Sequence, residues 1–429
     1  MYSIARKRGL GKVKVAKRRE GLKELMELAG INNVDIKVSL IQSLIPVGLE
    51  KVNILLQDEV GRLAGEPRKH GKVNTRWGSQ GGSVYLSDQK VPIEVPRVRN
   101  KMKNAEVRLE AYQKLQEPHR LDEQLFLKLL NGLSTHKYRE SSELVPEVFG
   151  ISASNVSKRF KRCGKAYLEK LLSRRLDEHD FIAMFLDGKT YAKDGIVVAI
   201  GITLEGRKVI VGIEQINTEN SRSVGQFFDK LIARGFKYEQ GLLCVVDGAK
   251  GFTKAIEDKF KEYAFIQRCQ QHKKENVASY LAKGLQKTYR LRLTKAYEQA
   301  TYSQAKIALN AIALELDRIN PSAAASLREG LEETLTLHKL GLSRELRRSF
   351  SSTNCIESVL SQVGQYTDKV DRWRNGRHIQ NWVASSLMHI ESKLNKVNGW
   401  RHLKLLRERM QKAMHNQMQE ETILIPSEA

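Results

Sequence analysis

The sequence has few of the features that mark secreted and membrane proteins. Its 429 residues include only four cysteines, scattered along the chain, which predicts reduced thiols and no disulfide framework. No apolar run reaches the length of a transmembrane helix, and the basic N-terminus lacks the apolar core of a signal peptide. We therefore expect a cytoplasmic protein.

Acidic residues are also scarce relative to basic ones. The chain has 49 acids against 73 bases, a formal charge of +24 and a pI of about 9.8. This excess predicts a polyanionic partner such as nucleic acid, although a ribosomal or membrane-surface partner would suit the same total. The length allows two or three domains and a large core.

Two apolar runs end abruptly in an acid followed by glycine. The run that begins at Phe181 stops at Asp187, and the run that begins at Gly241 stops at Asp247. Both runs fit buried strands, and chemistry in α/β sheets collects beyond the carboxyl ends of strands, so we expect the two acids to lie together. Either acid alone has a structural explanation, since Asp-Gly is common in turns and Asp is common as a helix N-cap.

The elements around these two acids follow a defined order. With the first acid-bearing strand, they predict three strands followed by alternating helices and strands, which is the order of a ribonuclease H-like α/β core with a mixed five-stranded sheet. The further elements are strands at 195–203 and 207–214, a helix at 220–236, the second acid-bearing strand, a helix at 249–263, a strand at 264–269 and a helix from 272 to about 281.

Six short motifs also occur in the order found in a known family. The chain resembles the mutator-type transposases of bacterial insertion sequences, from Pro96-Arg97 to about Ile390. The motifs are Thr218-Glu-Asn-Ser221, Asp247-Gly248, Phe252-Thr-Lys-Ala-Ile256, Cys269-Gln-Gln-His272, Asn276-Val277 and Thr353-Asn-Cys-Ile-Glu357.

The resemblance implies a DDE transposase, whose three acids fall here on Asp187, Asp247 and Glu357. It implies double-stranded DNA partners, the terminal inverted repeats and the target, bound by a homodimer or higher oligomer, with the protein associated with the bacterial nucleoid. It also implies an α-helical insertion, because the segment before Glu357 is too long for one helix and a loop. Residues 283–350 fill it, with helices expected at 305–316 and 323–337.

Glu357 has a rival explanation. Asn354-x-x-Glu357 has the spacing of a capping box, in which the acid reaches back to the backbone of the cap residue. The spacing alone favours capping. The resemblance favours catalysis, because the family's last acid stands in the same Thr-Asn-x-x-Glu setting at the start of a helix.

Three carboxylates suit phosphoryl chemistry because oxygen ligands hold Mg²⁺ or Mn²⁺, which offsets the negative charge of a phosphodiester. Two ions about 3.5–4 Å apart can stabilise both the attacking and the leaving oxygen. We hypothesise that Asp187 contacts both ions and that Asp247 and Glu357 complete one site each. Water would free a 3′-hydroxyl at the element end, and that hydroxyl would then attack target DNA without a covalent protein intermediate.

Cys269-x-x-His272 suggests zinc, but a zinc site needs two more ligands and no second pair at suitable spacing lies nearby. We therefore favour a buried thiol beside a histidine at a helix start, close to the acids, where His272 assists catalysis or contacts DNA.

The N-terminal half reads as DNA-binding. A basic run covers residues 1–20, a mainly helical pattern interrupted at Pro46 covers 22–63, and a small basic β-ribbon covers 67–100. Trp77 in this ribbon is expected to pack, with stacking on a base as the alternative. A helix-turn-helix pattern follows at 121–172, with helices at 124–133 and 141–149 and a turn at 150–152.

The candidate recognition helix begins at Ala153. Its outward side chains can contact bases and phosphates, while Val156 and Phe160 point inward; plain packing of the helix pair is the alternative. The predicted DNA contacts on this helix are Ser154, Asn155, Lys158, Arg159 and Arg162. Further along the chain, we predict that Arg372 and Trp373 contact DNA, with Trp373 stacking on a displaced base.

These patterns predict a chain of several parts. A DNA-binding regulator on the same fold without catalysis, and a nuclease or resolvase without strand transfer, remain as alternatives. The expected parts are a basic arm and helical region (1–66), a basic β-rich segment (67–118), a helix-turn-helix domain (119–175), the first part of the catalytic core (176–282), the insertion (283–350), the last part of the core (351–400) and a C-terminal helix with tail (401–429).

Overall fold

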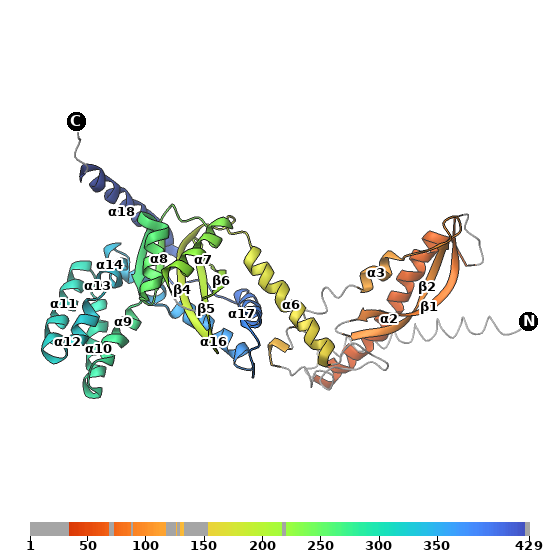
Figure 1. Ribbon diagram of the computed structural model, residues 1–429, viewed down its shortest axis with the longest axis horizontal. Coiled ribbons are helices and arrows are strands. Elements are labelled where there is room, and N and C mark those ends of the chain that lie inside the picture. The colour runs from red at the N-terminus through yellow and green to blue at the C-terminus, as the bar shows by residue number, and fades with distance from the viewer. Residues whose placement is uncertain are drawn as a thin grey trace, which may run out of the picture. The chain divides into compact units, whose positions relative to one another are not determined.

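The chain forms two compact units, Met1–Cys163 and Gly164–Ala429, drawn in Figure 1. The computed structural model describes residues 34–67, 73–86, 89–116, 126, 129–132, 153–216 and 220–424. Among these residues, no helix is both long and apolar enough to cross a bilayer. The predicted arm at 1–20 and most of the first two helices of the helix-turn-helix pattern lie outside the described residues.

The first unit is built on a hairpin packed against a long helix. Val52, Leu56 and Val60 recur every four residues on α2 and are buried, so this face of the helix lies on the buried valines of the sheet. The predicted β-ribbon is confirmed, but α2 continues through Pro46, so the predicted interruption is wrong. The elements that begin in this unit are α2 (Val34–Ala64), β1 (Asn74–Leu86), β2 (Gln89–Asn100), β3 (Ala105–Val107), α3 (Glu110–Gln116) and α6 (Ala153–Ser173).

The second unit contains the predicted mixed five-stranded sheet. Its strand order is β6-β5-β4-β7-β8; β4, β5 and β6 are antiparallel, whereas β7 and β8 run parallel to β4. The sheet elements are β4 (Phe181–Tyr191), β5 (Asp194–Thr203), β6 (Lys208–Gln215), α7 (Ser221–Ala233), β7 (Leu242–Val246), α8 (Lys250–Phe260), a 3-10 turn (Lys261–Tyr263), β8 (Ala264–Arg268) and α9 (Gln270–Ser279).

Both faces of this sheet are buried, because successive side chains of a strand point to opposite faces. In β5, Ile196, Val198 and Ile200 belong to one core while Val197 and Ala199 belong to the other. Helices α7 and α8 cover the second face. The first face is covered mainly by α16 (Asn354–Thr367), α17 (Gly376–Glu391) and α18 (Leu403–Leu424), as Figure 1 shows for α16 and α17.

Between α9 and α16 the chain is helical. The part up to Leu335 has a core of its own, whereas Leu337 to Phe350 contribute to the core on the first face of the sheet. The helix expected at 305–316 is confirmed within α11, but the one expected at 323–337 is wrong, because Gly330 adopts a left-handed φ of +60° that ends regular helix. The helices are α10 (Lys283–Tyr297), α11 (Tyr302–Ile319), α12 (Pro321–Arg328), α13 (Leu331–Thr334), α14 (Thr336–Lys339) and α15 (Ser343–Phe350).

Candidate active site

Asp187 and Asp247 lie at the same edge of the central sheet. Strands β4 and β7 are parallel neighbours in which Phe185 pairs with Val245. Asp187 lies two residues after Phe185, and Asp247 lies two residues after Val245. The apolar run predicts this position, but the strand end that it predicts at Asp187 is wrong. Strand β4 continues to Tyr191 because its other edge stays paired with β5.

Backbone N–H groups hold both aspartates. The Gly188 N–H donates to Asp187 Oδ1 at 2.9 Å, and the Ala249 N–H donates to Asp247 Oδ1 at 2.9 Å. Helix α8 begins at Lys250 with Ala249 as N-cap and no side-chain cap, so Asp247 is not the cap of this helix. Its bond to an N–H two residues on forms an Asx-type turn. The two carboxylates are therefore oriented locally.

Glu357 lies in the first turn of α16, but not as part of a capping box. The helix begins at Asn354 with Thr353 as N-cap, and no side chain caps it. The Glu357 carboxylate instead accepts a hydrogen bond from the Thr353 hydroxyl. The Glu357 side chain therefore does not cap the helix backbone, which is the role that the spacing favours.

Asp187 is largely buried and lies within range of the charges of both other acids. Burial raises the pKa of Asp187 to about 6; the Gly188 N–H opposes this shift, and the charges of Asp247 and Glu357 add to it. Carboxylates repel in this way only when they are close and share little water. The folded chain therefore brings together acids from β4, the end of β7 and the start of α16.

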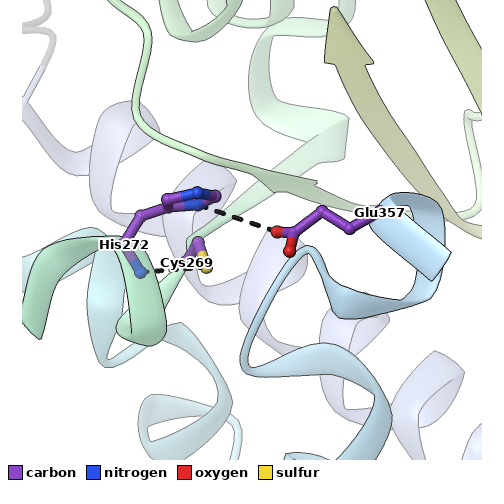
Figure 2. A group of neighbouring side chains, drawn as sticks. All are labelled: Cys269, His272 and Glu357. Atoms are coloured by element: carbon purple, nitrogen blue, oxygen red, sulfur yellow. Dashed lines mark hydrogen bonds and ion pairs between the residues drawn. The ribbon is translucent and has the colours of Figure 1, made fainter. Parts of the chain in front are cut away.

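A second cluster adjoins Glu357 and is shown in Figure 2. Cys269 is fully buried at the N-cap of α9, where its sulfur accepts the His272 N–H at 3.4 Å and the Thr353 N–H at 3.4 Å. His272 Nδ1 lies 3.2 Å from Thr353 Oγ1 and 3.9 Å from Glu357 Oε1. This confirms a buried thiol beside a helix-start histidine near the acids.

The pair formed by Cys269 and His272 is polarised. Its hydrogen bond with Cys269 raises the pKa of His272 to about 9; burial opposes this, and the nearby carboxylates reinforce it. Burial works to raise the pKa of Cys269, but hydrogen bonds with His272 and Thr353 outweigh it and lower the pKa. A positive imidazolium therefore lies next to the acids at neutral pH and offsets part of their charge.

The possible metal ligands near Glu357 form two sets, one with sulfur, nitrogen and oxygen atoms and one with oxygen atoms alone. Within the described part of the chain, Cys269, His272 and Glu357 offer ligand atoms that all lie within 4.8 Å of one another, which adds one carboxylate to the motif. The hydroxyl of Thr353 lies among these atoms. Asp187, Asp247 and Glu357 supply only oxygen, the donor that Mg²⁺ and Mn²⁺ prefer, and their mutual repulsion is what a bound cation relieves.

Comparison with known proteins identifies the family. The sequence pattern of the Mutator family of transposases matches residues 16–395, most of the chain. The chain belongs to the Mutator family of transposases.

Relatives in this family come from insertion sequences. The Mutator-family chain is 27% identical over 340 residues to the transposase for insertion sequence element IS905 of Lactococcus lactis subsp. lactis, covering 76% of this chain and 81% of that protein. It is 25% identical over 370 residues to the transposase for ISRM5 of Rhizobium meliloti, covering 84% and 89%. It is 26% identical over 275 residues to the transposase for IS256 in transposon Tn4001 of Staphylococcus aureus, covering 61% and 67%.

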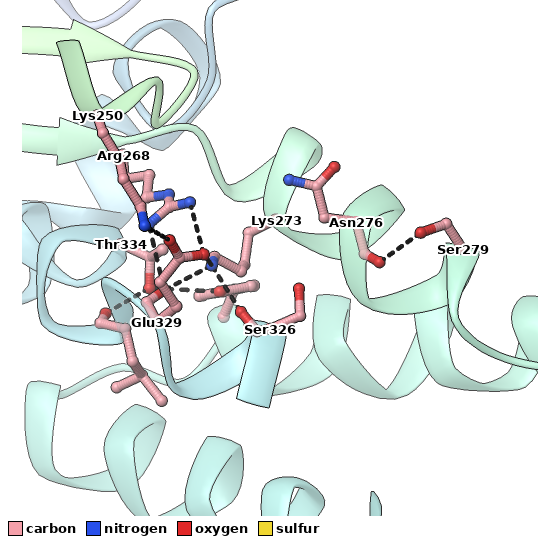
Figure 3. A network of polar contacts seen from close by, with 10 residues as sticks. Lys250, Arg268, Lys273, Asn276, Ser279, Ser326, Glu329 and Thr334 are labelled. Carbon is pink, nitrogen blue, oxygen red and sulfur yellow. Dashed lines mark hydrogen bonds and ion pairs between the residues drawn. The ribbon is translucent and has the colours of Figure 1, made fainter. Parts of the chain in front are cut away.

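In this Mutator-family chain, Arg268 lies between the turn after Asp247 and the helices that separate α9 from α16. Figure 3 shows its guanidinium beside Glu329. Its guanidinium donates to the Glu329 backbone and side chain, each at 3.3 Å. Two glycines lie against the Arg268 side chain. A Cβ on Gly248, whose φ is +104°, would be 2.1 Å from it, and a Cβ on Gly330 would be 2.3 Å from it. Arg268 thus fills the space between the turn after Asp247 and the turn at Gly330.

Lys273 strengthens the same junction. It is buried, and its ammonium donates to the backbone carbonyls of Ser326 at 2.7 Å and Glu329 at 2.5 Å (Figure 3). Burial and the charge of Arg268 lower the pKa of Lys273 to about 8, against the opposing charge of Glu329. The buried cations Arg268 and Lys273 therefore hold the helices between α9 and α16 against the sheet.

The helix predicted from Ala153 is confirmed as α6, while its role in DNA recognition stays a prediction. Ser154, Lys158 and Arg162 are exposed, whereas Asn155 has no described side chain. The prediction that Arg159 points outward is wrong: it is 6% exposed, and its guanidinium lies 5.8 Å from the ring centre of Tyr85. It follows the buried Val156 by three residues and so shares its face.

The segment after α16 places Arg372 on the surface and Trp373 partly inside. Arg372 is exposed, whereas Trp373 packs at the margin of the core with ring centres 5.9 Å from Tyr191, 5.4 Å from His378 and 6.5 Å from Trp382. Stacking of Trp373 on a base is possible only at its open side and stays a prediction.

Two residues of the site escape the sequence patterns. Thr353 is fully buried, and its hydroxyl has contacts with Cys269, His272 and Glu357. Its place before the helical Asn-x-x-Glu is a sequence signal for an N-cap, not for a contact with the acid. Arg268 lies in an ordinary strand pattern, and no neighbouring residue predicts its contact with the distant turn at Gly330.

Proposed function

We propose that the chain is a DDE transposase that binds the ends of its insertion sequence, cuts DNA and joins the cut end to a target. The observation that carries the proposal is the placement of Asp187 and Asp247 two residues beyond the paired Phe185 and Val245 of β4 and β7, with Glu357 near enough for its charge to add to the burial that raises the pKa of Asp187. Three acids from separate elements at one sheet edge form the oxygen donor set that metal-dependent phosphoryl transfer requires.

The sheet supports a ribonuclease H-like core. Three antiparallel strands followed by two strands parallel to the first, in the order β6-β5-β4-β7-β8, is the arrangement expected for that fold. Helices α10–α15 would then be the insertion before the last acid. The separate core of α10–α13 and the Arg268 junction suit a module added to the sheet and held against it, with α14 and α15 packed on the core of the sheet.

The three carboxylates would hold Mg²⁺ or Mn²⁺, which supplies charge neutralisation and an activated water when bound. The chain's own groups prepare this site. Backbone N–H groups orient Asp187 and Asp247, and Thr353 orients Glu357. His272, as an imidazolium, lowers the local negative charge and can donate a proton toward a phosphate or leaving oxygen.

The DNA partners would be the terminal inverted repeats and the target duplex, bound by a homodimer or larger oligomer in the bacterial nucleoid. Lys158 and Arg162 on the open side of α6 suit phosphate and base contacts, with Ser154 beside them. Arg372 offers a further exposed cation.

The test is cleavage and joining of a labelled duplex that carries the element end, with Mg²⁺ or Mn²⁺. Wild type should nick at the end and join the product to a second DNA. Asp247→Asn should bind the same duplex with unchanged affinity and lose cleavage by at least about 100-fold, because one oxygen ligand is neutralised. Asp317→Asn, which changes an exposed acid paired with Arg328, is the control and should remain active.

Two results would move the function elsewhere. Binding without cleavage by wild type under either metal would favour a DNA-binding regulator on the same fold. Cleavage without joining would favour a nuclease or resolvase.

A further inference from the structure

The hairpin of the first unit carries an exposed tryptophan at an irregular point of the sheet. The register between β1 and β2 shifts between Arg76 and Ser79, and Gly78 within this shift has a φ of +74°. Trp77 stands in the shift and is 44% exposed, so the packing expected for it is only partial. A bulge re-aims the side chains it carries, which explains why a large apolar ring points outward.

Two arginines of β2 lie over this ring. The guanidinium carbon of Arg97 is 4.1 Å from the ring centre of Trp77, and that of Arg99 is 4.4 Å away. The two arginines are two residues apart on β2 and so share a face of the sheet. The tryptophan therefore gathers two cations at one point, at the distance of a cation–π contact.

Each arginine is also held from its other side. Arg97 forms a two-pronged hydrogen bond with Glu106 on β3, with both distances 2.8 Å, and Arg99 donates to Asn104 at 2.6 Å. Long side chains usually lose conformational freedom when they bind a ligand. In the folded chain, contacts with Glu106 and Asn104 already restrict the conformational freedom of Arg97 and Arg99.

The surroundings are basic. The described residues of the three strands and their turns, 73–86 and 89–108, hold seven bases and two acids, Glu94 and Glu106. Glu106 is paired with Arg97, and the Ser79 hydroxyl lies 3.5 Å from Glu94. A net positive surface with ordered arginines is the pattern of a phosphate-contacting face.

We propose that Trp77, Arg97 and Arg99 form a DNA phosphate clamp, a contact surface for duplex DNA separate from helix α6. The clamp rests on the proposed function for its ligand, the duplex of the element end, but not on catalysis. Guanidinium groups match phosphate oxygens in a planar, two-point geometry, and an aromatic face keeps the guanidinium plane fixed. The contact fixes the position of the first unit on DNA and does not read the base sequence.

The experiment measures binding of the full chain to a fluorescent duplex of the element end over a series of salt concentrations. Arg97→Gln with Arg99→Gln should weaken binding about tenfold at moderate salt and reduce the slope of log affinity against log salt by about 1–2, since each released phosphate contact removes about 0.9. A duplex of unrelated sequence should lose affinity to the same degree. Lys114→Gln, at an exposed cation of α3 in the same unit, is the control and should leave the slope unchanged.

Trp77→Ala separates the clamp from base stacking. In the clamp, this variant weakens duplex binding and lowers the salt slope in part, because the guanidinium planes lose their support. A loss of affinity seen only for DNA with an unpaired base, at unchanged slope, would overturn the clamp in favour of stacking on Trp77. An unchanged slope in the double arginine variant would also overturn it.

A second measurement needs no substitution and decides the question if the double variant fails to fold. Phenylglyoxal modifies accessible arginines of the wild-type protein, and peptide mass spectrometry reports each site. Duplex DNA should slow the modification of Arg97 and Arg99 several-fold. Equal modification of both with and without DNA would overturn the clamp, whatever the outcome of the cleavage assay.

Discussion

The hydroxyl of Thr353 donates a hydrogen bond to the carboxylate of Glu357 at the start of α16. The same oxygen lies 3.3 Å from Cys269 Sγ and 3.2 Å from His272 Nδ1. One buried hydroxyl thus links the last acid to the N-terminus of α9. Such partners of a metal-binding carboxylate usually fix its orientation.

Removing this hydroxyl should impair catalysis more than folding. We expect Thr353→Val to lower the cleavage rate about 10–100-fold and to raise the Mg²⁺ concentration needed for half-maximal activity, because Glu357 loses its orientation. Thr353→Ser should keep most activity. Thr367→Val, at the other end of α16, removes a hydroxyl that is equally buried but far from the acid along the helix and should cleave normally. Normal metal dependence in Thr353→Val would show that the hydroxyl serves only packing.

The pKa of Asp187 predicts the pH dependence of stability without metal. The folded-state pKa of about 6 lies above the ordinary value of 3.8. A raised pKa means that this group's contribution to stability is complete below the unfolded pKa and is lost as pH rises through 6. Asp187→Asn should therefore raise the free energy of unfolding at pH 8 in EDTA by about 1–3 kcal/mol and have little effect at pH 3–4.

Thermal unfolding in EDTA from pH 4 to pH 8 checks this sign. Asp317→Asn serves as the control on an exposed acid. Added Mg²⁺ should stabilise wild type more than Asp187→Asn at pH 8, because a cation relieves the same repulsion. A fall in stability on Asp187→Asn at pH 8 would contradict the raised pKa of Asp187.

Arg268 should affect the active site although it is not one of the three acids. We expect Arg268→Met to slow cleavage about 10–100-fold with little change in DNA affinity, because the turn after Asp247 loses the side chain that fills it against Gly330. Arg292→Met removes an arginine paired with Glu315 on the outer helices and should cleave normally. Equal rates for the two variants would show that the junction does not position Asp247.

The open side of α6 predicts how DNA binding depends on salt. Lys158→Gln with Arg162→Gln should weaken binding to the element end and reduce the salt slope by about 2, since each phosphate contact contributes about 0.9. Lys165→Gln, at a cation of the same helix that faces Glu169, should change the slope less. A double variant that binds like wild type at every salt concentration would remove α6 from the interface.

The strands and most helices near the site follow from local patterns. The apolar runs before Asp187 and Asp247 predict β4 and β7 because burial on both faces demands continuous apolar side chains. Asn220 predicts the start of α7, where its side chain accepts the Ser223 N–H at 2.9 Å. These elements depend on residues close in sequence, which is why their positions can be predicted.

Other features depend on contacts between distant segments. Spacing assigns Glu357 to a capping box, yet α16 begins one residue earlier than that box requires and leaves its carboxylate with Thr353. Composition places Arg159 outside, yet packing within the first unit buries it. Gly330 interrupts an otherwise helical pattern because the chain there turns against Arg268.

The sequence by itself determined the order of the elements, the positive charge and Asp187 and Asp247 as candidates, because each depends on composition or on neighbours within a few residues; Glu357 became a candidate through the family resemblance. Only the tertiary structure decided that Asp187 shares its electrostatic field with Asp247 and Glu357, and that Thr353 and Arg268 support them. Side chains separated by tens of residues come into contact only when strand pairing and helix packing bring them together, and no local sequence pattern predicts such a contact.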